Sequence, residues 1–357
     1  VHIVYVKPWY KLQVGDFPSR TEAERAQTVL SNLGFTDTWI TTFAASPTGE
    51  SYVWLDGVQL SEPLPRASKI TLEPLDANAR FQLNGHRYRG RLVIALDQQL
   101  RLTAINVLPM EEYLYGVVSA EMGNAGLNEI EALKAQAVAA RTYAINHLGS
   151  YEAQGFDVLG TVQSQAYYGT DRETAPARYA VDATKGQVMV YGGEIPSTVY
   201  HSNAGGHTAF AEEVWGVYSP ILRGQSETIF SRSGGREMVL GVDKLGYAWE
   251  VTLQKKDLDE LAARLDFAGA AIRDVVVEAR GKSGRVTQLR VETSVGDAVL
   301  FRDKIRQILG GARMLQSTKF HLEKRFHNDS LMSVTIRGFG YGHGLGMSQA
   351  GAIDLAA

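Results

Sequence analysis

The side chain best placed for acid–base chemistry is a glutamate at the end of an apolar helix. Glu121 lies in the run Val-Val-Ser-Ala-Glu-Met at positions 117–122. Apolar surroundings disfavour a carboxylate and raise the pKa of the carboxyl group, and the negative end of the helix dipole acts in the same direction. Such a group can serve as a general acid near neutral pH. The alternative is a solvated surface glutamate. Glu111 and Glu112 lie in the first turn of the same helix, where carboxylates are stabilising, and we interpret them as structural.

A glycine-rich segment follows the last predicted strand. Glycine occupies every second position from 338 to 346, and on an extended segment these glycines would share one bare face. Two interpretations fit this pattern. One is close packing of strand against strand. The other is a backbone wall that a bulky ligand approaches, with His343 and Gln349 as polar partners.

A polar loop at residues 200–208 contains two histidines, His201 and His207. They could ligate a metal ion, but two histidines form half of a site, and no cysteine or well-spaced carboxylate completes it. We therefore interpret the loop as a hydrogen-bonding one. We expect no metal site and no cofactor.

Length and composition set the broad class of the protein. The chain has 357 residues, of which 45% are hydrophobic and 21% charged, as in ordinary globular proteins of two or three domains. A net charge of −3 argues against a dedicated nucleic-acid binder. The absence of cysteine excludes disulfides and thiolate chemistry. No apolar stretch reaches the roughly 18 residues that cross a bilayer. Because the chain begins with Val1, we expect an upstream segment, including any signal region, to be missing.

The elements that must position these groups indicate an α+β fold. The N-terminal residues predict a β-β-α-β unit, with strands at 3–6, 10–17 and 38–43 and a helix that Ser19 caps and that ends near Leu33. Strands and turns follow from 52 to 107, with an Asn84-Gly85 hairpin turn.

Two helices come next, the second of them rich in alanine. The first begins at Pro109 and ends near Gly123, and the second runs from about Asn128 to Leu148. Residues 161–235 are interpreted as short strands and loops. Residues 247–320 predict strand, helix, strand, strand and helix, and a final strand covers 334–336.

Taken together, several segments resemble the stage II sporulation protein D (SpoIID/LytB) family. The resemblance spans about residues 65 to 357 in family order. The matching segments are 88–90, 108–122 (Leu-Pro-Met-Glu-Glu-Tyr-Leu-Tyr-Gly-Val-Val-Ser-Ala-Glu-Met), 132–144, 165–169, 201–208, 214–215, 283–286 and 340–352 (Gly-Tyr-Gly-His-Gly-Leu-Gly-Met-Ser-Gln-Ala-Gly-Ala).

The first 45 residues resemble the second half of a SPOR domain, a module that binds peptide-stripped peptidoglycan. The cue is Tyr-Lys-Leu-Gln-Val-Gly-Asp-Phe at 10–17, followed by the helix. The resemblance implies glycan contacts at Gln13, Gly15 and Phe17.

In the SpoIID family the glutamate of the Ser/Ala-Glu-Met motif is the catalytic acid of a lytic transglycosylase, which implies this role for Glu121. Cleavage between N-acetylmuramic acid and N-acetylglucosamine would then proceed without water. Glu121 would protonate the glycosidic oxygen and afterwards accept the proton of the C6 hydroxyl as a 1,6-anhydro ring closes. Two-carboxylate glycosidases need a second acid, whereas this intramolecular attack does not.

The other family segments would line the substrate groove. Tyrosines suit stacking on sugar rings, and the polar side chains suit recognition of hydroxyl and acetamido groups. The residues implied as substrate-binding are Arg141, Gln165, Tyr167, Tyr168, His201, Ser202, Gly205, Gly206, Thr208, Arg223, Gly342, His343, Ser348 and Gln349.

This chain departs from the family pattern at two sites. Some members hold zinc by Cys and His, and without cysteine we expect no such site. Where the family often has Tyr-Leu-x-Lys, this chain has Ile221-Leu222-Arg223, and arginine keeps the charge without the ammonium geometry.

The predicted organisation is a partial SPOR-like domain at 1–45, a linker at 46–64 and a strand-rich SpoIID-type catalytic region at 65–357. The Ala-rich helical pair is inserted in that region, and about 240–320 form an α/β subdomain within it. The expected location is the extracytoplasmic cell envelope, periplasm or cell wall. The expected partners are peptidoglycan glycan strands and a cell-wall amidase, with no nucleic acid. The alternative function is a non-enzymatic, wall-binding enhancer of a separate N-acetylmuramoyl-L-alanine amidase.

Overall fold

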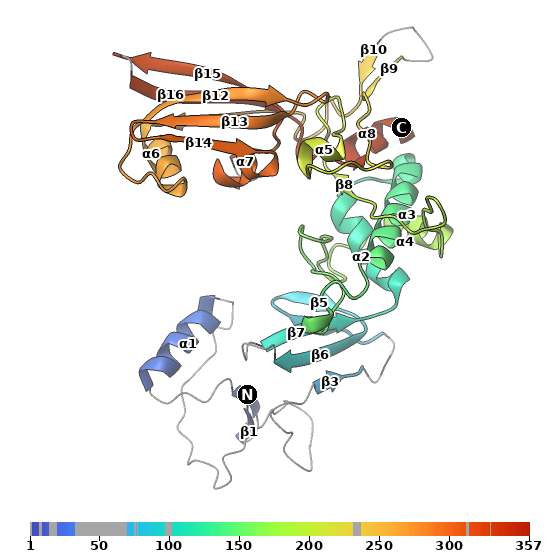
Figure 1. Cartoon of the computed structure of the whole chain (residues 1–357). Coiled ribbons are helices and arrows are strands. Elements are labelled where there is room, and N and C mark those ends of the chain that lie inside the picture. Colours follow the sequence, from blue (N-terminus) through green and yellow to red (C-terminus); the bar gives the residue numbers. More distant parts are fainter. Residues whose placement is uncertain are drawn as a thin grey trace. The chain divides into compact units, whose positions relative to one another are not determined.

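A computed structural model describes residues 2–6, 9–13, 20–32, 70–74, 76, 78–96, 102–230, 237–311, 314–328 and 330–357. The chain forms two compact units. The first holds residues 1–109, 151–156 and 168–171, and the second holds 110–150, 157–167 and 172–357. Helices and strands occur along the chain (Figure 1), which confirms the α+β fold class.

The N-terminal elements of the first unit agree with the predicted pattern. Strands β1 (His2–Val6) and β2 (Trp9–Gln13) pair antiparallel, and helix α1 covers Arg20–Asn32. The predicted Ser19 cap, the strand at 38–43 and the linker at 46–64 lie outside the described residues.

The rest of the first unit is built from short antiparallel strands. Strand β6 lies between β3 and β7, and β4 pairs with β5. Their bounds are β3 Ile70–Leu72, β4 Phe81–Leu83, β5 His86–Tyr88, β6 Arg91–Leu96 and β7 Leu102–Val107. Asn84 and Gly85 have φ of 50° and 81°, as the predicted two-residue hairpin turn requires.

Three helices form the first part of the second unit and pack against one another. They are α2 (Met110–Met122), α3 (Ile130–Asn146) and α4 (Ala175–Ala183), with a short 3₁₀ turn, η1 (Leu127–Glu129), between the first two. Small side chains allow the close approach, since Ala137, Ala140 and Ala177 are fully buried.

Helix α4 corrects the prediction that residues 161–235 contain only strands and loops. Thr174 caps the helix by accepting a hydrogen bond from the Ala177 N–H at 3.4 Å. Ala177, Ala180 and Val181 make a buried stripe at helical spacing. This stripe is only three residues long, which is why the surrounding polar residues obscured it.

The second part of this unit contains two three-stranded antiparallel sheets with helices against them. The strand orders are β11-β16-β15 and β12-β13-β14. The bounds are β11 Ala248–Gln254, α6 Lys255–Arg264, β12 Ile272–Arg280, β13 Val286–Thr293, β14 Asp297–Phe301, α7 Asp303–Ile308, β15 Phe320–His327 and β16 Ser330–Phe339. In Figure 1, α6 and α7 lie on the same side of the β12-β13-β14 sheet.

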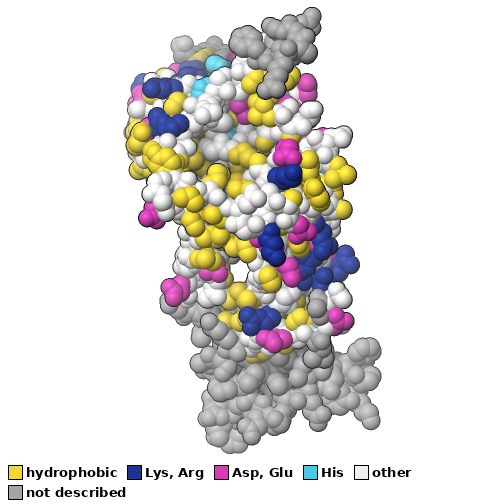
Figure 2. Space-filling view, turned by 90° about the vertical axis from the view of Figure 1, so that its right-hand side faces the viewer, with side chains coloured by type: hydrophobic (Ala, Val, Ile, Leu, Met, Phe, Trp, Pro, Cys, Tyr) yellow, Lys and Arg dark blue, Asp and Glu magenta, His cyan; other side chains and the backbone are white. Residues whose placement is uncertain are grey.

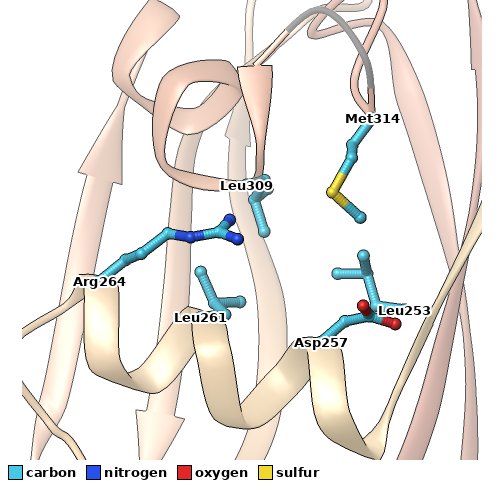
Figure 3. A pocket seen from close by; sticks show the side chains of 6 residues that line it. All are labelled: Leu253, Asp257, Leu261, Arg264, Leu309 and Met314. Atoms are coloured by element: carbon cyan, nitrogen blue, oxygen red, sulfur yellow. The ribbon is translucent and has the colours of Figure 1, made fainter. Parts of the chain in front are cut away.

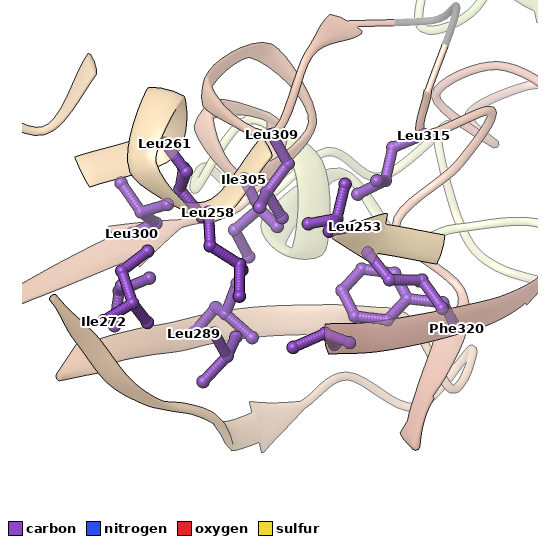
Figure 4. Packing of buried hydrophobic residues seen from close by; sticks show 14 of the residues in the cluster. Leu253, Leu258, Leu261, Ile272, Leu289, Leu300, Ile305, Leu309, Leu315 and Phe320 are labelled. Atoms are coloured by element: carbon purple, nitrogen blue, oxygen red, sulfur yellow. The ribbon is translucent and has the colours of Figure 1, made fainter. Parts of the chain in front are cut away.

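The core of this part is a cluster of buried side chains, most of them branched aliphatic ones, that includes Phe320. Leu258 and Leu261 of α6 point toward Leu289 of β13 and Ile305 of α7 (Figure 4), and each is at most 1% exposed. The prediction of strand, helix, strand, strand and helix missed β14 and β15. Both strands have many exposed residues, so the alternation of apolar residues that marks a half-buried strand is weak.

Short elements lie between the helices and the sheets. Strand β8 (Tyr200–His201) pairs parallel with β17 (Met347–Ser348), and helix α8 (Gln349–Ala356) follows β17 at once. The others are α5 (Ala211–Val214), β9 (Thr228–Phe230) and β10 (Glu237–Val239). No helix in the described ranges combines the length and apolarity that crossing a membrane requires.

The glycine-rich segment is not the extended, bare-faced strand that its spacing suggested. Gly340, Gly342, Gly344 and Gly346 all have positive φ, between 70° and 105°, a region that other residues rarely adopt. The segment packs against residues that come earlier in the sequence, among them Val199 and Arg285. A Cβ on Gly344 would lie 2.2 Å from an Arg285 guanidinium nitrogen, and one on Gly346 would lie 1.9 Å from the Val199 carbonyl oxygen. Close packing against backbone and buried side chains of other segments therefore accounts for these glycines.

We expect Gly346→Ala to lower the free energy of unfolding by about 2–4 kcal/mol, because the new methyl group combines backbone strain with a clash against backbone. Gly192 is the matched control, since its φ is +60° and a Cβ there would meet nothing within 4 Å. Gly192→Ala should cost only the strain, about 1–2 kcal/mol. Urea unfolding of both variants measures the difference, and equal losses would contradict the packing argument.

Candidate active site

Glu121 lies in the last turn of α2 and is part-buried. Its Oε1 accepts a hydrogen bond from the Ala166 backbone N–H at 2.7 Å. Its Oε2 accepts one from Gln349 Nε2 at 3.3 Å. Three segments that are distant in the sequence therefore meet at this carboxyl group: the end of α2, the loop at 165–167 and the start of α8.

Burial raises the pKa of Glu121, and the hydrogen bonds from Ala166 and Gln349 oppose this shift by favouring the carboxylate. The net direction is upward, as the apolar helix end predicts. The two oxygens are not equivalent. Because Oε1 already accepts a short bond from a backbone donor, the proton of the acid form belongs on Oε2.

Gln165, next to Ala166, is fully buried and joins two tyrosines. Its Nε2 donates to the Ala140 carbonyl at 3.2 Å and to Tyr200 Oη at 2.9 Å, and its Oε1 accepts from Tyr113 Oη at 3.0 Å. The Ala140 carbonyl fixes the orientation of this amide, since two oxygens in contact would repel.

This orientation assigns opposite roles to the two tyrosine hydroxyls. Tyr113 gives its proton to Gln165, so its oxygen is left to accept. Tyr200 accepts from Gln165, so its own proton is left to donate. Burial raises the pKa of both tyrosines, and the nearby Glu121 charge raises each further. Tyr200 is part-buried, and among the described residues no acceptor is found for its proton.

Two histidines hold the strand that carries Tyr200 against the glycine-rich segment. His343 accepts from the Leu345 N–H at its Nδ1, at 3.0 Å, and a hydrogen bond with the Tyr200 backbone favours its charged form. The Nδ1 of His201 bonds the Leu345 carbonyl at 2.9 Å. Burial lowers the pKa of His343 to about 4 and lowers that of His201 well below its usual value. Both rings are neutral near pH 7.

The fully buried Arg285 lies behind this segment and binds two carbonyl groups of the preceding loop. Its guanidinium donates to the His207 carbonyl at 2.8 Å and to the Ala204 carbonyl at 3.2 Å. Burial lowers its pKa to about 10, which leaves it charged at neutral pH. The contact ties the turn just before β13 to the loop at 203–208.

The structure brings four of the predicted substrate-binding residues to the surroundings of Glu121 in other roles. Gln349 contacts the carboxylate itself, Gln165 orients the tyrosines, and His343 holds Tyr200. Tyr167 packs its ring 5.1 Å from that of Tyr113. Tyr167 is 9% exposed, so it offers little surface for the expected stacking on a sugar.

Two predicted substrate-binding arginines are already engaged within the protein. Arg141 is 1% exposed and binds both carboxylate oxygens of Glu111, at 3.0 and 2.6 Å. Arg223 binds both oxygens of Glu212, at 2.7 and 2.9 Å, and lies over the rings of Phe210 and Tyr218. These ion pairs give both arginines a structural role, and a substrate contact by either one stays a prediction.

The small residues of the family segments shape the loops. Gly205 and Gly342 leave room for Gly340 and His201, and both have positive φ, as does Gly206. The carbonyl of Ser202 accepts the Ala350 N–H at 2.9 Å. Thr208 Oγ1 accepts the Gln225 N–H at 2.8 Å. Ser348 caps α8 by accepting the Gly351 N–H at 3.2 Å.

The remaining predicted positions belong to the first unit. Tyr168 is part-buried, with its ring 5.8 Å from that of His86. Gln13 ends β2 opposite His2. Gly15 and Phe17 lie outside the described residues.

Sequence interpretation missed Tyr113, Tyr200 and Gln136. Tyr200 belongs to the polar cluster at 200–208, but the metal-binding interpretation considered for that cluster concerned only its two histidines. Gln136 is a polar side chain on a buried, Ala-rich helix, and this anomaly was the available signal. As the hydrogen-bonding interpretation of that cluster predicts, His201 and His207 each direct Nδ1 at a backbone carbonyl. The described residues include no cluster of three or more potential metal ligands.

Two hollows elsewhere in the second unit are not lined by Glu121. The cavity between α6 and α7 has a volume of about 10 Å³ and is closed by Leu309, Met314 and Arg264 (Figure 3), so it holds at most one water. A shallow cleft of about 300 Å³ lies beside Glu212 and Phe301. On the face drawn in Figure 2, basic and acidic side chains are interspersed.

Comparison with known families covers most of the chain. The SPOR domain family matches residues 1–42, the SpoIID family, described as stage II sporulation protein, matches 98–191, and a domain of unknown function matches 233–346. The SPOR match confirms the predicted SPOR-like region at the N-terminus.

Three similar proteins extend the comparison. An uncharacterized protein of Brachyspira hyodysenteriae is 30% identical over 301 residues, covering 84% of this chain and 74% of that protein. Stage II sporulation protein D of Bacillus subtilis is 30% identical over 268 residues, covering 71% and 70%. The amidase enhancer of the same organism is 28% identical, covering 80% of this chain and 43% of that protein. The chain belongs to the stage II sporulation protein D family.

We expect the stability of the fold to fall between pH 7 and pH 5 because of His343. The unfolded ring binds a proton near pH 6.5 and the folded one near 4, so the stabilisation present above pH 6.5 is lost as the pH falls toward 4. Desolvation is the main cause, with Arg306, His201 and Arg285 nearby and Asp303 opposing. His343 should account for about 2 kcal/mol between pH 7 and pH 5.

Urea unfolding at both pH values tests this expectation. His343→Gln should show a smaller pH dependence than the parent, whereas His321→Gln, which changes an exposed histidine of β15, should not. An unchanged pH dependence in His343→Gln would refute the assignment.

Proposed function

We propose that this protein is a peptidoglycan lytic transglycosylase. It cleaves the bond between N-acetylmuramic acid and N-acetylglucosamine and leaves 1,6-anhydro ends. The observation that carries the proposal is Glu121, a part-buried carboxyl group with a raised pKa, whose Oε1 is held by the Ala166 N–H and whose Oε2 has only the longer contact with Gln349 among the described residues. Membership of the SpoIID family supports an enzyme that acts on the cell wall.

In the first step Glu121 acts as the general acid. The proton on Oε2 passes to the glycosidic oxygen as the bond to the muramic acid C1 breaks. The short bond from Ala166 holds Oε1 and hence the direction of Oε2. A positioned proton donor of this kind contributes about 10²–10⁴-fold to the rate.

In the second step the Glu121 carboxylate acts as the base. It takes the proton from the C6 hydroxyl of the muramic acid, whose oxygen attacks C1 and closes the 1,6-anhydro ring. The groups that hydrogen-bond to Glu121 in the described part of the chain are an amide N–H and a carboxamide. Neither can act as a second acid, which suits intramolecular attack and not the two-carboxylate scheme of glycoside hydrolases.

Tyr200 is proposed as a substrate-contacting donor beside Glu121. Gln165 occupies its oxygen as an acceptor, so the hydroxyl proton is available to a sugar oxygen or an acetamido carbonyl. Its raised pKa keeps the proton in place at any pH at which the enzyme would work.

The proposed substrate is the peptide-stripped glycan strand of the cell envelope, and the proposed location is the periplasm or the cell wall. The SPOR match supports both, since this module binds such strands. A cell-wall amidase, which produces stripped strands, is the proposed partner.

The second candidate function is a non-enzymatic enhancer of that amidase. The similarity to the Bacillus subtilis amidase enhancer favours it. Such a protein would not need the protonation chemistry of Glu121, so the two candidates differ in what a substitution there would do.

We expect Glu121→Gln to abolish the release of anhydro-ended fragments from purified peptide-stripped glycan strands, with a loss of about 10²-fold or more. The amide keeps the shape of the side chain but cannot give up and regain the proton. Mass spectrometry of the products checks this, with Glu131→Gln, an exposed residue of α3 that pairs with Lys134, as the active control.

Other outcomes each have a meaning. Products from Glu121→Gln at the parent rate would move the catalytic group elsewhere. Reducing-end products from the parent would indicate a hydrolase. Retained binding without products, together with stimulation of an amidase by both proteins, would establish the enhancer.

Tyr200→Phe should lower kcat/KM by about tenfold to a hundredfold, because it removes one hydrogen bond to the substrate. Tyr179→Phe is the control, since Tyr179 is 57% exposed on α4. Steady-state rates on defined glycan oligomers check this, and thermal unfolding confirms that both variants are folded. Rates equal to the parent would exclude a substrate contact by the Tyr200 hydroxyl.

A further inference from the structure

A second glutamine supports the one that contacts Glu121. Gln349 Nε2 lies 3.3 Å from Glu121 Oε2 and 3.4 Å from Gln136 Oε1. Gln136 comes from α3 and is fully buried, and Gln349 is 7% exposed. The carboxyl group and the two carboxamides therefore form a short chain from α2 through α8 to α3.

In this arrangement one donor of the three side chains makes no hydrogen bond. Gln136 Nε2 is buried and finds no hydrogen-bond acceptor among the described residues. A buried N–H group without a partner costs about 1–3 kcal/mol, and such groups are rare in folded proteins. Only Gln349 lies between Gln136, which carries this unpartnered nitrogen, and the proposed catalytic acid Glu121.

A half-turn of each carboxamide exchanges its donor and acceptor ends without moving any other atom. After both turns Gln136 Nε2 faces Gln349 Oε1 and donates to it. Gln349 Oε1 also faces Glu121 Oε2, so it repels a carboxylate there but accepts a hydrogen bond from a protonated carboxyl group. The buried atom left without a partner is then the Gln136 carbonyl oxygen, which is tolerated better than an orphaned N–H. Gln349 Nε2 gives up its two bonds and takes the place of its own Oε1, which is not among the buried atoms without a partner.

We propose that Gln349 and Gln136 reverse their amide orientations together when Glu121 changes its protonation state. With the carboxylate, Gln349 donates to Oε2. With the acid, the Oε2 proton is donated to Gln349 Oε1, and Gln136 donates to the same oxygen. Both glutamines are positioning residues, because they act on the substrate only through Glu121.

The inference rests on the proposed function where it concerns catalysis. The same pair would hold Oε2 before the proton leaves for the glycosidic oxygen and after the carboxylate forms. A fixed donor would favour the base and weaken the acid. A reversible partner serves both steps with one set of atoms.

The other titratable groups that couple to Glu121 are Tyr113 of α2 and Tyr200 of β8. Both keep their protons across the pH range in which a carboxylic acid titrates. Between Glu121 and these two tyrosines, Glu121 is therefore the group whose change of charge would reorient the glutamines.

The direct test needs no substrate. In protein labelled with ¹⁵N at glutamine side chains, the amide signals of Gln136 and Gln349 are assigned by their loss in Gln136→Met and Gln349→Met. In a pH titration both signals should shift together with one midpoint, and Glu121→Gln should abolish the shift. A shift of the Gln349 signal alone, or no shift, would overturn the proposal whether or not the protein is an enzyme.

The kinetic test uses the energetic preference of Gln136. Its Nε2 has an acceptor only when Glu121 is protonated, so Gln136 favours the acid form of Glu121. Gln136→Met removes this preference, so the alkaline limb of the pH–rate profile should move down by about one pH unit. Gln82→Met, which changes an exposed residue of β4, should leave the limb in place. A uniform loss of rate with an unmoved limb would assign Gln136 a purely structural role. An inactive parent would refute the proposed function and leave the titration as the test.

Discussion

The hydrogen bond from the Ala166 backbone N–H to Glu121 Oε1 is the contact on which the site depends. A side-chain donor could rotate away, but a backbone N–H is held by the chain on both sides. Its presence at 2.7 Å fixes which carboxyl oxygen is occupied and leaves Oε2 as the atom that can carry a proton. The neighbouring Gln165 fixes Tyr200 in the same way, through the Ala140 carbonyl. The consecutive loop residues Gln165 and Ala166 therefore determine which oxygen of Glu121 can carry a proton and leave the Tyr200 hydroxyl as a donor.

The second oxygen of the carboxyl group, Oε2, is contacted by a residue far away in the sequence, Gln349. Gln349 reaches Oε2 only because β17 pairs with β8 and α8 starts immediately after it. The glycines of the preceding segment allow this close passage, and Arg285 closes it from behind by binding the carbonyls of Ala204 and His207. Buried groups far from Glu121 thus control the position of one amide. The strand-rich part of the unit acts as a support for the helical part, through β13 and the residues around it.

Much of the fold could be predicted from local patterns, and the limits of the prediction follow from what those patterns omit. The helix ending at Met122 and the Asn84-Gly85 hairpin have strong local signals and were found. Helix α4 has a buried stripe of only three residues and was missed. Glycines at every second position suggested an extended strand, yet four of them have positive φ, and Gly344 and Gly346 lie against Arg285 and Val199, which are far away in the sequence. In the site, the apolar neighbours of Glu121 made it a candidate but left a surface glutamate as the alternative, and its assignment as the acid rests on the family motif. Gln136 and Tyr200 could not be assigned, since their roles depend on hydrogen bonds between segments 35 to 213 residues apart.

A single carboxyl group that must act first as an acid and then as a base meets conflicting physical demands. Burial raises its pKa and favours the acid, while each hydrogen bond donated to it favours the carboxylate. Enzymes with two carboxylates divide these demands between two environments. Here one environment must serve both states, so the partner of the reactive oxygen has to change its character while its position stays fixed. Among protein side chains, a carboxamide does this by a half-turn, and a second carboxamide behind it retains a hydrogen bond in either orientation. In the proposed mechanism the unpartnered nitrogen of Gln136 marks the carboxylate state, and it favours a return of Glu121 to its protonated form.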